Sequence, residues 1–432
     1  MKKVGLITLG CDKNRIDGEK LLGKFILNGF SVVQDISDAD VIIVNTCGFI
    51  ENAKKESIDA IFDAIDIKTK TGAKVVVTGC LAERYGEELK QDIPEADHVL
   101  SLCDNDEILA ILGEKQETYH DNARVLTTPP HYAYLKIADG CNNHCAFCAI
   151  PKIRGRYISR PKEDIISEAR ELVEKFGVKE LIVVAQDTTR YGYDLYGKYE
   201  IVDLLKSLTE LDVTWVRLMY CYPELISDEL IKFVAENDKM CKYLDIPMQH
   251  ACDKILLDMK RRNNKQDAKK LIERIRRICP NISIRSTFMV GFPGEDENDF
   301  RELIDFLQDE KLDNVGFFAY SREEGTLSYS MKPQIPAKVK KARLKEAFLT
   351  QQSIAFSKLE SLVGKTLKVL YEGIDDKKQM FVARSEYQAP DIDGKIYFTA
   401  DFCPLVGEYY NVKITKTDNY DLIGEIHNEF SK

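Results

Sequence analysis

The sequence of 432 residues has no apolar run that approaches the roughly 18 residues of a membrane-spanning helix. The apolar run at residues 4–9 is also too short for a secretory signal, so we expect a cytoplasmic protein. An excess of positive charge is missing as well, because the formal net charge is −10. Overall electrostatics therefore does not favour a nucleic-acid backbone, although a local basic groove stays compatible with this charge.

The chain contains twelve cysteines, which in a cytoplasmic protein indicate metal binding or catalysis rather than disulfides. Cys141, Cys145 and Cys148 have the spacing C-x3-C-x2-C. Three thiolates can hold three irons of a [4Fe–4S] cluster and leave the fourth iron open for a substrate or cofactor. The alternatives are a zinc site completed by His144 or three unrelated buried cysteines, but zinc sites more often pair C-x2-C units with distant partners.

Residues 1–117 alternate apolar runs with helical patterns. This alternation predicts a parallel sheet covered by helices on both faces, as in flavodoxin- or Rossmann-like domains. The expected strands are residues 4–9, 41–44 and 75–77, and the expected helices are residues 14–28 and 52–67.

Each of these three expected strands ends in a cysteine, namely Cys11, Cys47 and Cys80. The carboxyl ends of parallel strands lie along one edge of a sheet, so the three side chains should converge. We interpret them as ligands of a second [4Fe–4S] cluster. The alternative is three ordinary buried cysteines, since free cysteine is often buried. Cys103 lies outside the pattern and is interpreted as structural.

Residues 127–358, which begin within a linker that contains Pro129 and Pro130, again alternate strand and helix patterns. Six such units predict a partial (β/α)6 barrel, open on one side, whose chemistry lies at the carboxyl ends of its strands. The cysteine loop follows the first strand. The expected strands are residues 132–138, 180–185, 215–220, 243–248, 282–290 and 314–320.

Polar residues follow several of these strands. They include Gln186 after the second strand and the turn Gly291–Glu295 after the fifth. A glycine-rich turn alone is a weak signal. His250 is as compatible with a structural role as with a catalytic one, and Lys260–Arg262 is interpreted as a solvated helix end.

Residues 361–428 contain short alternating strands, which predict a small β-barrel. From residue 361 to the last residue there are nine Lys and Arg against twelve Asp and Glu, a net charge of −3. A phosphate-binding surface should be locally basic, so this domain is not expected to bind a nucleic acid. The acidic turn at residues 389–394 suits a basic protein partner, and the alternative is a solvated loop.

Several motifs resemble one family. The cysteine triplet resembles the signature of radical S-adenosylmethionine (SAM) enzymes, and Leu9–Asn14, Asn45–Cys47 and Thr78–Cys80 resemble the N-terminal domain of the methylthiotransferases. One departure is Gly18, where serine is expected. Four further segments resemble the branch of this family that modifies a ribosomal protein, namely residues 148–155, 185–192, 245–250 and 389–394. The C-terminal domain resembles a TRAM domain, which usually binds RNA in relatives.

The resemblance implies transfer of a methylthio group to the β-carbon of an aspartate in ribosomal protein S-twelve of the small subunit, free or assembled. Two SAM molecules and a sulfur source are consumed. Cys141, Cys145 and Cys148 would hold the cluster that cleaves SAM, and Cys11, Cys47 and Cys80 the cluster that presents sulfur. Candidate SAM contacts are Gln186, Gly291, Gly294 and Glu295, and no single catalytic residue is assigned. We expect the enzyme to be a monomer and to receive electrons from a reductant such as a flavodoxin.

Two other functions fit parts of the sequence. A tRNA methylthiotransferase acting on a modified adenosine would have the same cysteines, so only the branch-specific loops and the acidic C-terminal domain argue against it. An iron–sulfur electron carrier or cluster scaffold would bind iron without cleaving SAM, and it leaves the predicted barrel unexplained.

Overall fold

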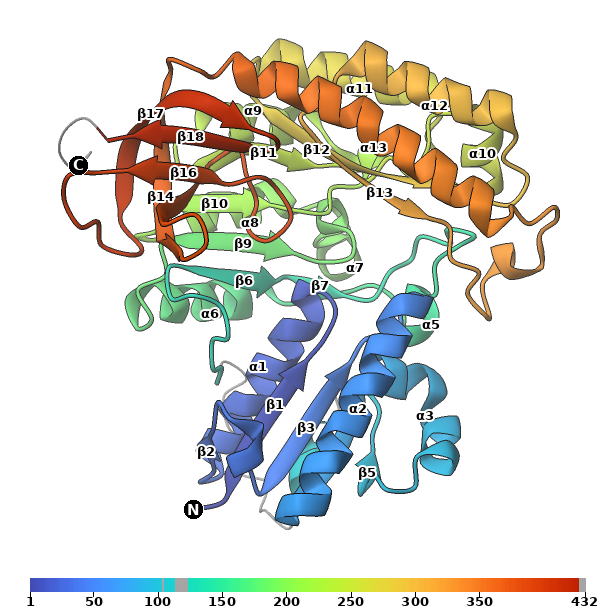
Figure 1. Ribbon diagram of the computed structural model, residues 1–432, viewed down its shortest axis with the longest axis vertical. Helices are drawn as coiled ribbons and strands as arrows, with labels where there is room; N and C mark the ends of the chain where they lie inside the picture. Colours follow the sequence, from blue (N-terminus) through green and yellow to red (C-terminus); the bar gives the residue numbers. More distant parts are fainter. Residues whose placement is uncertain (103–104, 113–122, 427–432) are drawn as a thin grey trace.

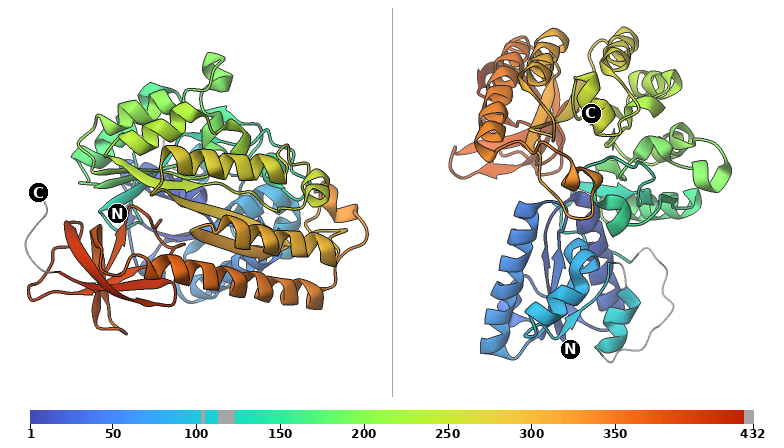
Figure 2. Two further views of the ribbon diagram at one scale, coloured as in Figure 1. Left: turned by 90° about the horizontal axis from the view of Figure 1, so that it is seen from above. Right: turned by 90° about the vertical axis from the view of Figure 1, so that its right-hand side faces the viewer.

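The computed structural model of the protein describes residues 1–102, 105–112 and 123–426. Figures 1 and 2 show an N-terminal α/β unit, a larger central α/β unit and a small β-barrel. This architecture confirms the predicted fold class. Cys103, interpreted above as structural, lies outside the described residues. Within the described ranges, no helix is long and apolar enough to cross a membrane.

The N-terminal unit is a five-stranded parallel sheet in the order β2-β1-β3-β4-β5, which is the flavodoxin-like order. Its central strand is buried on both faces: Val41 and Ile43 pack with α1 and α4, while Ile42 and Val44 pack with α2 and α3. The elements are β1 (Lys3–Thr8), α1 (Asp12–Leu27), β2 (Ser31–Val32), β3 (Val41–Thr46), α2 (Glu51–Thr71), β4 (Lys74–Gly79), α3 (Cys80–Asp92), β5 (His98–Val99) and α4 (Asn105–Ile111).

The central unit is a six-stranded parallel sheet in the order β13-β12-β11-β10-β9-β6, with helices on its outer face. Its strands are β6 (Tyr132–Lys136), β9 (Glu180–Val184), β10 (Trp215–Leu218), β11 (Met240–Asp245), β12 (Ser283–Val290) and β13 (Asn314–Ala319), and β7 (Ala138–Asp139) pairs with β8 (Ile158–Ser159). Its helices are α5 (Ile150–Ile153), α6 (Lys162–Glu174), α7 (Tyr193–Tyr196), α8 (Ile201–Thr209), α9 (Asp228–Glu236), α10 (Asp253–Asp258), α11 (Lys265–Ile278), α12 (Glu297–Glu310) and α13 (Ala337–Glu360).

Of the six central strands, β11 differs most from its predicted range. The strand expected at residues 243–248 is β11, which begins at Met240 and ends at Asp245. Beyond that point the side chain of Ser286 accepts the backbone N–H of Met248 at 3.3 Å, and Gln249 adopts a left-handed φ of 75°. The regular ladder is thus interrupted after Asp245, although Gln249 still exchanges backbone hydrogen bonds with β12.

The small barrel is closed by five strands in the order β14-β15-β16-β18-β17. Val369, Phe398, Tyr410 and Leu422 fill its interior. Its strands are β14 (Thr366–Asp375), β15 (Met380–Ser385), β16 (Ile396–Thr399), β17 (Tyr409–Asp418) and β18 (Asp421–Glu425).

The small barrel packs into the inner, concave face of the central sheet. Ile182 and Trp215 of the sheet share one apolar cluster with Leu370 and Tyr409 of the barrel. At the same interface the fully buried carboxylate of Glu180 accepts hydrogen bonds from Arg217 at 2.7 Å and from Arg384 at 2.8 Å. The concave face is therefore filled at this end and stays available only nearer the carboxyl ends of the strands.

The N-terminal unit is fastened to the central unit by buried charges. Arg124 pairs with Glu19 at 2.6 Å and with Glu168 of α6 at 3.0 Å, and Arg160 also pairs with Glu168 at 2.7 Å. In Figure 1 the arrowheads of β1 and β3 point toward the central unit near β7. The carboxyl edge of the first sheet thus faces the region where β6 ends.

Candidate functional site

Three cysteines lie at the carboxyl ends of three neighbouring strands in the N-terminal sheet. Cys11 caps α1 after β1, Cys47 follows β3 directly, and Cys80 begins α3 after β4. Gly10 has a φ of 87°, and a Cβ atom there would lie 2.7 Å from the Cys47 sulfur. The glycine is therefore required for the close approach of the loops that carry Cys11 and Cys47.

Arg154 connects this strand-end site to the central unit. It follows α5, the short helix after the cysteine loop, and its Nη2 lies 3.5 Å from Cys80 Sγ and 2.9 Å from Asp17. Its Nη1 donates to Asp139 at 3.1 Å, and Lys136 pairs with both of these aspartates. Burial raises the pKa of Cys80 to about 12, although the Arg154 charge acts in the opposite direction.

The second group of cysteines occupies the loop between β7 and α5. The loop is held in place because Ala146 donates its N–H to Met259 O at 3.0 Å. The backbone N–H of Asn143 points at Cys141 Sγ at 3.4 Å, and the Asn143 amide donates to Asp187 at 3.0 Å. Asp187 itself is completely buried after β9. The loop is thus fixed by contacts to the end of α10 and to the segment that follows β9.

Arg261 shows that one sequence interpretation was wrong. Lys260 and Arg262 are exposed, as expected of a solvated helix end, but Arg261 is only 7% exposed. Its Nη1 lies 3.7 Å from Cys145 Sγ, and its guanidinium lies 4.2 Å from the ring centre of Tyr222. The Tyr222 hydroxyl also contacts Cys145 Sγ at 3.7 Å. A cation is therefore held against the middle cysteine, which no sequence pattern indicated.

The chemistry of both cysteine groups fits iron–sulfur ligation. All eleven cysteines in the described part of the chain are free thiols. Burial raises the pKa of Cys141 to about 11 and that of Cys148 to about 12, so nearby positive charge, as a bound metal supplies, is needed to keep them as thiolates. In the described ranges no three His, Cys, Asp or Glu side chains converge to hold a single metal ion. Such convergence is not needed for a cube, whose irons take thiolates at separate corners.

The four candidate SAM contacts lie at two strand ends. Gln186 follows β9, and its Oε1 is buried without a hydrogen-bond partner among the described residues. Gly291 has a φ of 74°, and a Cβ there would lie 2.2 Å from Lys340 of α13. Gly294 donates its N–H to Pro333 O at 2.9 Å.

Glu295 has a different environment from the other candidates. The residue is 2% exposed, and its carboxylate accepts the N–H of Gly291 at 2.8 Å and pairs with Arg343 of α13 at 2.8 Å. These contacts use the carboxylate to shape the turn and to fasten α13. Gln186, in contrast, keeps an unsatisfied acceptor that a ligand can use.

Tyr220, at the end of β10, is a feature that the sequence did not reveal. Its φ is 58°, a strained value for a tyrosine. Its hydroxyl donates to Asp12 at 3.1 Å, and Lys13 Nζ lies 3.3 Å from its ring centre and 3.0 Å from Asp12. Although burial alone lowers the pKa of Lys13, the charge of Asp12 raises it, so the lysine stays protonated.

A cavity of about 280 Å³ opens where the three units meet. The N-terminal unit contributes the wall that contains Cys11, and the central sheet and the small barrel close the other sides. Its lining residues are Gly10, Cys11, Asp12, Arg15, Tyr134, Ile182, Met219, Tyr220, Ala389, Pro390, Asp391 and Ile392.

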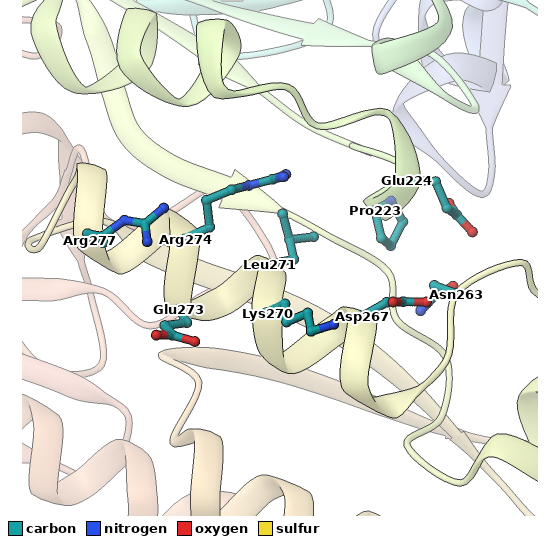
Figure 3. A pocket seen from close by; sticks show the side chains of 9 residues that line it. All are labelled: Pro223, Glu224, Asn263, Asp267, Lys270, Leu271, Glu273, Arg274 and Arg277. Carbon is teal, nitrogen blue, oxygen red and sulfur yellow. The ribbon is translucent and has the colours of Figure 1, made fainter.

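A larger cavity of about 520 Å³ lies elsewhere, along α11 on the outer face of the central unit (Figure 3). No cysteine lines it, and its charged side chains are balanced: Glu224, Asp267 and Glu273 against Lys270, Arg274 and Arg277. Despite its size, this cavity has neither the ligands nor the charge preference of a functional site.

Comparisons with solved structures reach the same fold. The chain resembles the radical SAM methyltransferase TsrM from Kitasatospora setae, with a TM-score of 0.53 and 14% identity over 73% of each chain. It also resembles the cobalamin-dependent SAM radical enzyme OxsB, with a TM-score of 0.51 and 12% identity over 82% of this chain and 56% of that one.

Family models match all three units. Residues 3–101 match the uncharacterized protein family UPF0004, residues 135–307 match the radical SAM superfamily, and residues 363–426 match the TRAM domain. These matches agree with the resemblance carried by the cysteine motifs and by the C-terminal strands.

Relatives extend over the whole chain. The ribosomal protein uS12 methylthiotransferase RimO of Acetivibrio thermocellus is 46% identical, with 100% of both chains covered. The enzyme of the same name from Clostridium acetobutylicum is 46% identical over 100% of this chain and 99% of its own. With this identity across all three units, the chain belongs to the family of radical SAM methylthiotransferases that modify ribosomal protein uS12.

Proposed function

We propose that this enzyme replaces one β-hydrogen of an aspartate in uS12, the small-subunit protein S-twelve, by a methylthio group. The observation that carries the proposal is the presence of two three-cysteine sites, each at the carboxyl end of strands of a parallel sheet, with the edge of the N-terminal sheet facing the region where β6 ends. An unactivated C–H bond is too inert for acid–base chemistry alone, so a cofactor must supply the difficult step.

Membership in the radical SAM superfamily implies SAM and a [4Fe–4S] cluster. Cys141, Cys145 and Cys148 are the proposed ligands. When bound, such a cluster supplies an open iron for SAM and the electron that cleaves it. The chain's own residues hold the loop and offset the sulfur charges: Arg261 stands against Cys145, and the Asn143 N–H points at Cys141.

Cys11, Cys47 and Cys80 are the proposed ligands of a second [4Fe–4S] cluster, which supplies the place where sulfur is presented. The donor set supports this proposal, because three free thiols follow adjacent strands and Gly10 leaves room between two of them. Arg154 offsets the charge at Cys80 while it belongs to the loop region of the first site. One SAM would be spent on hydrogen removal, and a second would supply the methyl group.

For SAM itself we keep Gln186, Gly291, Gly294 and Glu295 as the proposed site. The free acceptor of Gln186 supports a direct contact. Glu295 is assigned an indirect role, because its carboxylate already binds Gly291 and Arg343 and thereby holds the turn.

The acidic turn of the small barrel is proposed to meet the basic substrate. Only part of it is available, because Asp393 accepts hydrogen bonds from the Tyr243 hydroxyl at 2.7 Å and from the Ala389 N–H at 2.8 Å. Burial raises the pKa of Asp393, which serves to anchor the turn in the concave face. Asp391, by contrast, is exposed and lines the cavity of about 280 Å³ where the three units meet, called the junction cavity below.

The remaining expectations complete the proposal. The enzyme works in the cytoplasm as a monomer, and a small redox protein such as a flavodoxin reduces it. Its domains are proposed to extend over residues 1–117, 127–358 and 361–428. The substrate is uS12, either free or in the small subunit.

Mass spectrometry tests the proposed reaction. Reconstituted enzyme is incubated anaerobically with SAM, a reductant and either uS12 or tRNA. We expect a gain of about 46 daltons, the difference between H and SCH3, on an aspartate of uS12. A gain on a tRNA adenosine would overturn the proposed substrate, and formation of 5′-deoxyadenosine without either product would keep only the radical chemistry.

A further inference from the structure

The junction cavity is lined by one arginine that has no ion-pair partner in the part of the chain that the structure describes. Arg15 lines this cavity beside Cys11 and Asp12 and is half-buried. Among the described residues, no carboxylate lies within ion-pair distance of its guanidinium, and none accepts a hydrogen bond from it. A partly desolvated arginine attracts anions more strongly than one in bulk water, so its charge is available to a ligand that enters the cavity.

Of the other charges around the cavity, that of Asp12 is already matched. Lys13 pairs with Asp12 at 3.0 Å, and Asp12 also accepts the Tyr220 hydroxyl at 3.1 Å. Asp391 stands on the part of the wall formed by the small barrel, without an ion pair to Arg15. An acidic ligand is therefore repelled by the barrel side of the cavity and attracted by Arg15.

The position of Arg15 on α1 relates it directly to Cys11. The N–H of Arg15 donates to Cys11 O at 3.0 Å, so the two residues are one helical turn apart. Side chains at positions i and i+4 lie on the same face of a helix, and both of these line the same cavity. A group bound at Arg15 is thus held beside the strand-end cysteine site.

We propose that Arg15 binds the carboxylate of the target aspartate and makes the enzyme select an acidic side chain. This inference rests on the proposed function. In aspartate the carboxylate is attached to the β-carbon itself, so anchoring the carboxylate also fixes the carbon that reacts. The planar guanidinium matches a carboxylate with two parallel hydrogen bonds, whereas a lysine would offer only a point charge.

The test crosses enzyme variants with substrate variants. Full-length reconstituted wild type, Arg15→Gln and Arg15→Lys are compared on uS12 that carries either the target aspartate or asparagine in its place. Affinity is measured by fluorescence anisotropy of labelled uS12, and kcat/KM is measured by the methylthiolated product. Arg170→Gln is the control, since Arg170 is exposed on α6 and, within the described part of the chain, its one ion pair is with Glu174 at 3.4 Å.

Arg15→Gln should weaken binding and kcat/KM for the aspartate substrate by about tenfold or more, with Arg15→Lys intermediate. The same substitution should change binding of the asparagine substrate by less than about threefold, because no carboxylate is lost. SAM cleavage without substrate should stay at the wild-type rate, and the thermal unfolding midpoint should not change.

Equal losses for both substrates, or no loss for the aspartate substrate, would overturn the role of Arg15 while methylthiolation of uS12 by wild type stands. If wild type fails to modify uS12, the proposed function is wrong. The anisotropy measurements on the aspartate and asparagine substrates still decide separately whether Arg15 binds the carboxylate.

Discussion

The two cysteine sites are built in opposite ways. Cys141, Cys145 and Cys148 are brought together by a single loop, whereas Cys11, Cys47 and Cys80 come from three strand ends far apart in the chain. A loop site can be recognised from its spacing alone. A strand-end site exists only once the sheet has formed, because the order β1-β3-β4 places its members side by side.

The sites also differ in what surrounds them. The loop site is contacted by Arg261 and Tyr222 from the same unit. The strand-end site instead receives its cation, Arg154, from the central unit. The strand-end site should therefore depend on the contact between units, and the loop site should be largely independent of it.

Single cysteine substitutions should give the largest effects and separate the two roles. Cys145→Ala should abolish SAM cleavage, because the loop loses one of three ligands. Cys47→Ala should keep SAM cleavage but abolish methylthiolation. Both products, 5′-deoxyadenosine and modified uS12, are measured in one assay by chromatography and mass spectrometry. Normal methylthiolation by Cys47→Ala would remove the strand-end site from the reaction.

Glu168→Gln should loosen the junction between the units. Burial alone would raise the pKa of Glu168. The charges of Arg160, Lys20 and Arg124 instead hold this pKa at about 2, below its usual 4.5. A lowered pKa stabilises the fold above the unfolded value and loses this contribution as pH falls from 4.5 through about 2. Glu168→Gln should thus cost about 3 kcal/mol of unfolding free energy at neutral pH.

Urea unfolding across a pH series measures this effect. Glu171→Gln is the matched control on α6, because it removes a pair with Lys175 in which the lysine side chain is 70% exposed, and it should cost under about 1 kcal/mol. A cost for Glu168→Gln that does not shrink between pH 4 and pH 2 would contradict the proposed charge pairing.

Arg154→Met should weaken the strand-end site selectively. It removes the donor to Cys80, and loss of such a supporting contact typically reduces metal binding by about ten- to a hundredfold. Iron content and electron paramagnetic resonance should show the loop cluster intact and the second cluster depleted. Arg154→Lys, which keeps the charge, should lose less. If the loop cluster were depleted instead, Arg154 would support the loop site and not the strand-end site, contrary to the comparison above.

Tyr222→Phe should give the smallest effect. It removes a hydroxyl at 3.7 Å from Cys145 Sγ and leaves the ring against Arg261. A weak sulfur contact of this kind is worth about 1 kcal/mol or less, so binding of the loop cluster should fall by no more than about fivefold. A loss as large as that of Cys145→Ala would mean that the hydroxyl has a role beyond support.

The sequence predicted the elements whose signal is local. The apolar runs form the strands β1, β3 and β4, as expected; a cysteine follows β3 and β4 directly, and Cys11 follows β1 after two further residues. The strands β2 and β5 were not predicted, because two residues each are too few to produce a periodic pattern.

Features that depend on tertiary contacts could not be predicted. Arg261 is buried because it contacts Tyr222 and Pro247, which are distant in sequence. Its neighbours Lys260 and Arg262 are also basic, so the residue types alone do not show which of the three is buried. The strained backbone of Tyr220 and the contact of Arg154 with Cys80 likewise need the assembled units. Patterns of residue types predict where ligands lie, but not which charges are placed against them.

Iron quantification with Mössbauer spectroscopy tests the central claim most directly. Three anaerobically reconstituted proteins are compared: wild type, the triple alanine variant at Cys11, Cys47 and Cys80, and the triple alanine variant at Cys141, Cys145 and Cys148. The account predicts about eight irons per chain in wild type and about four in each variant, all as [4Fe–4S]. A strand-end variant that keeps the full wild-type iron content would contradict the existence of a second cluster at those three cysteines.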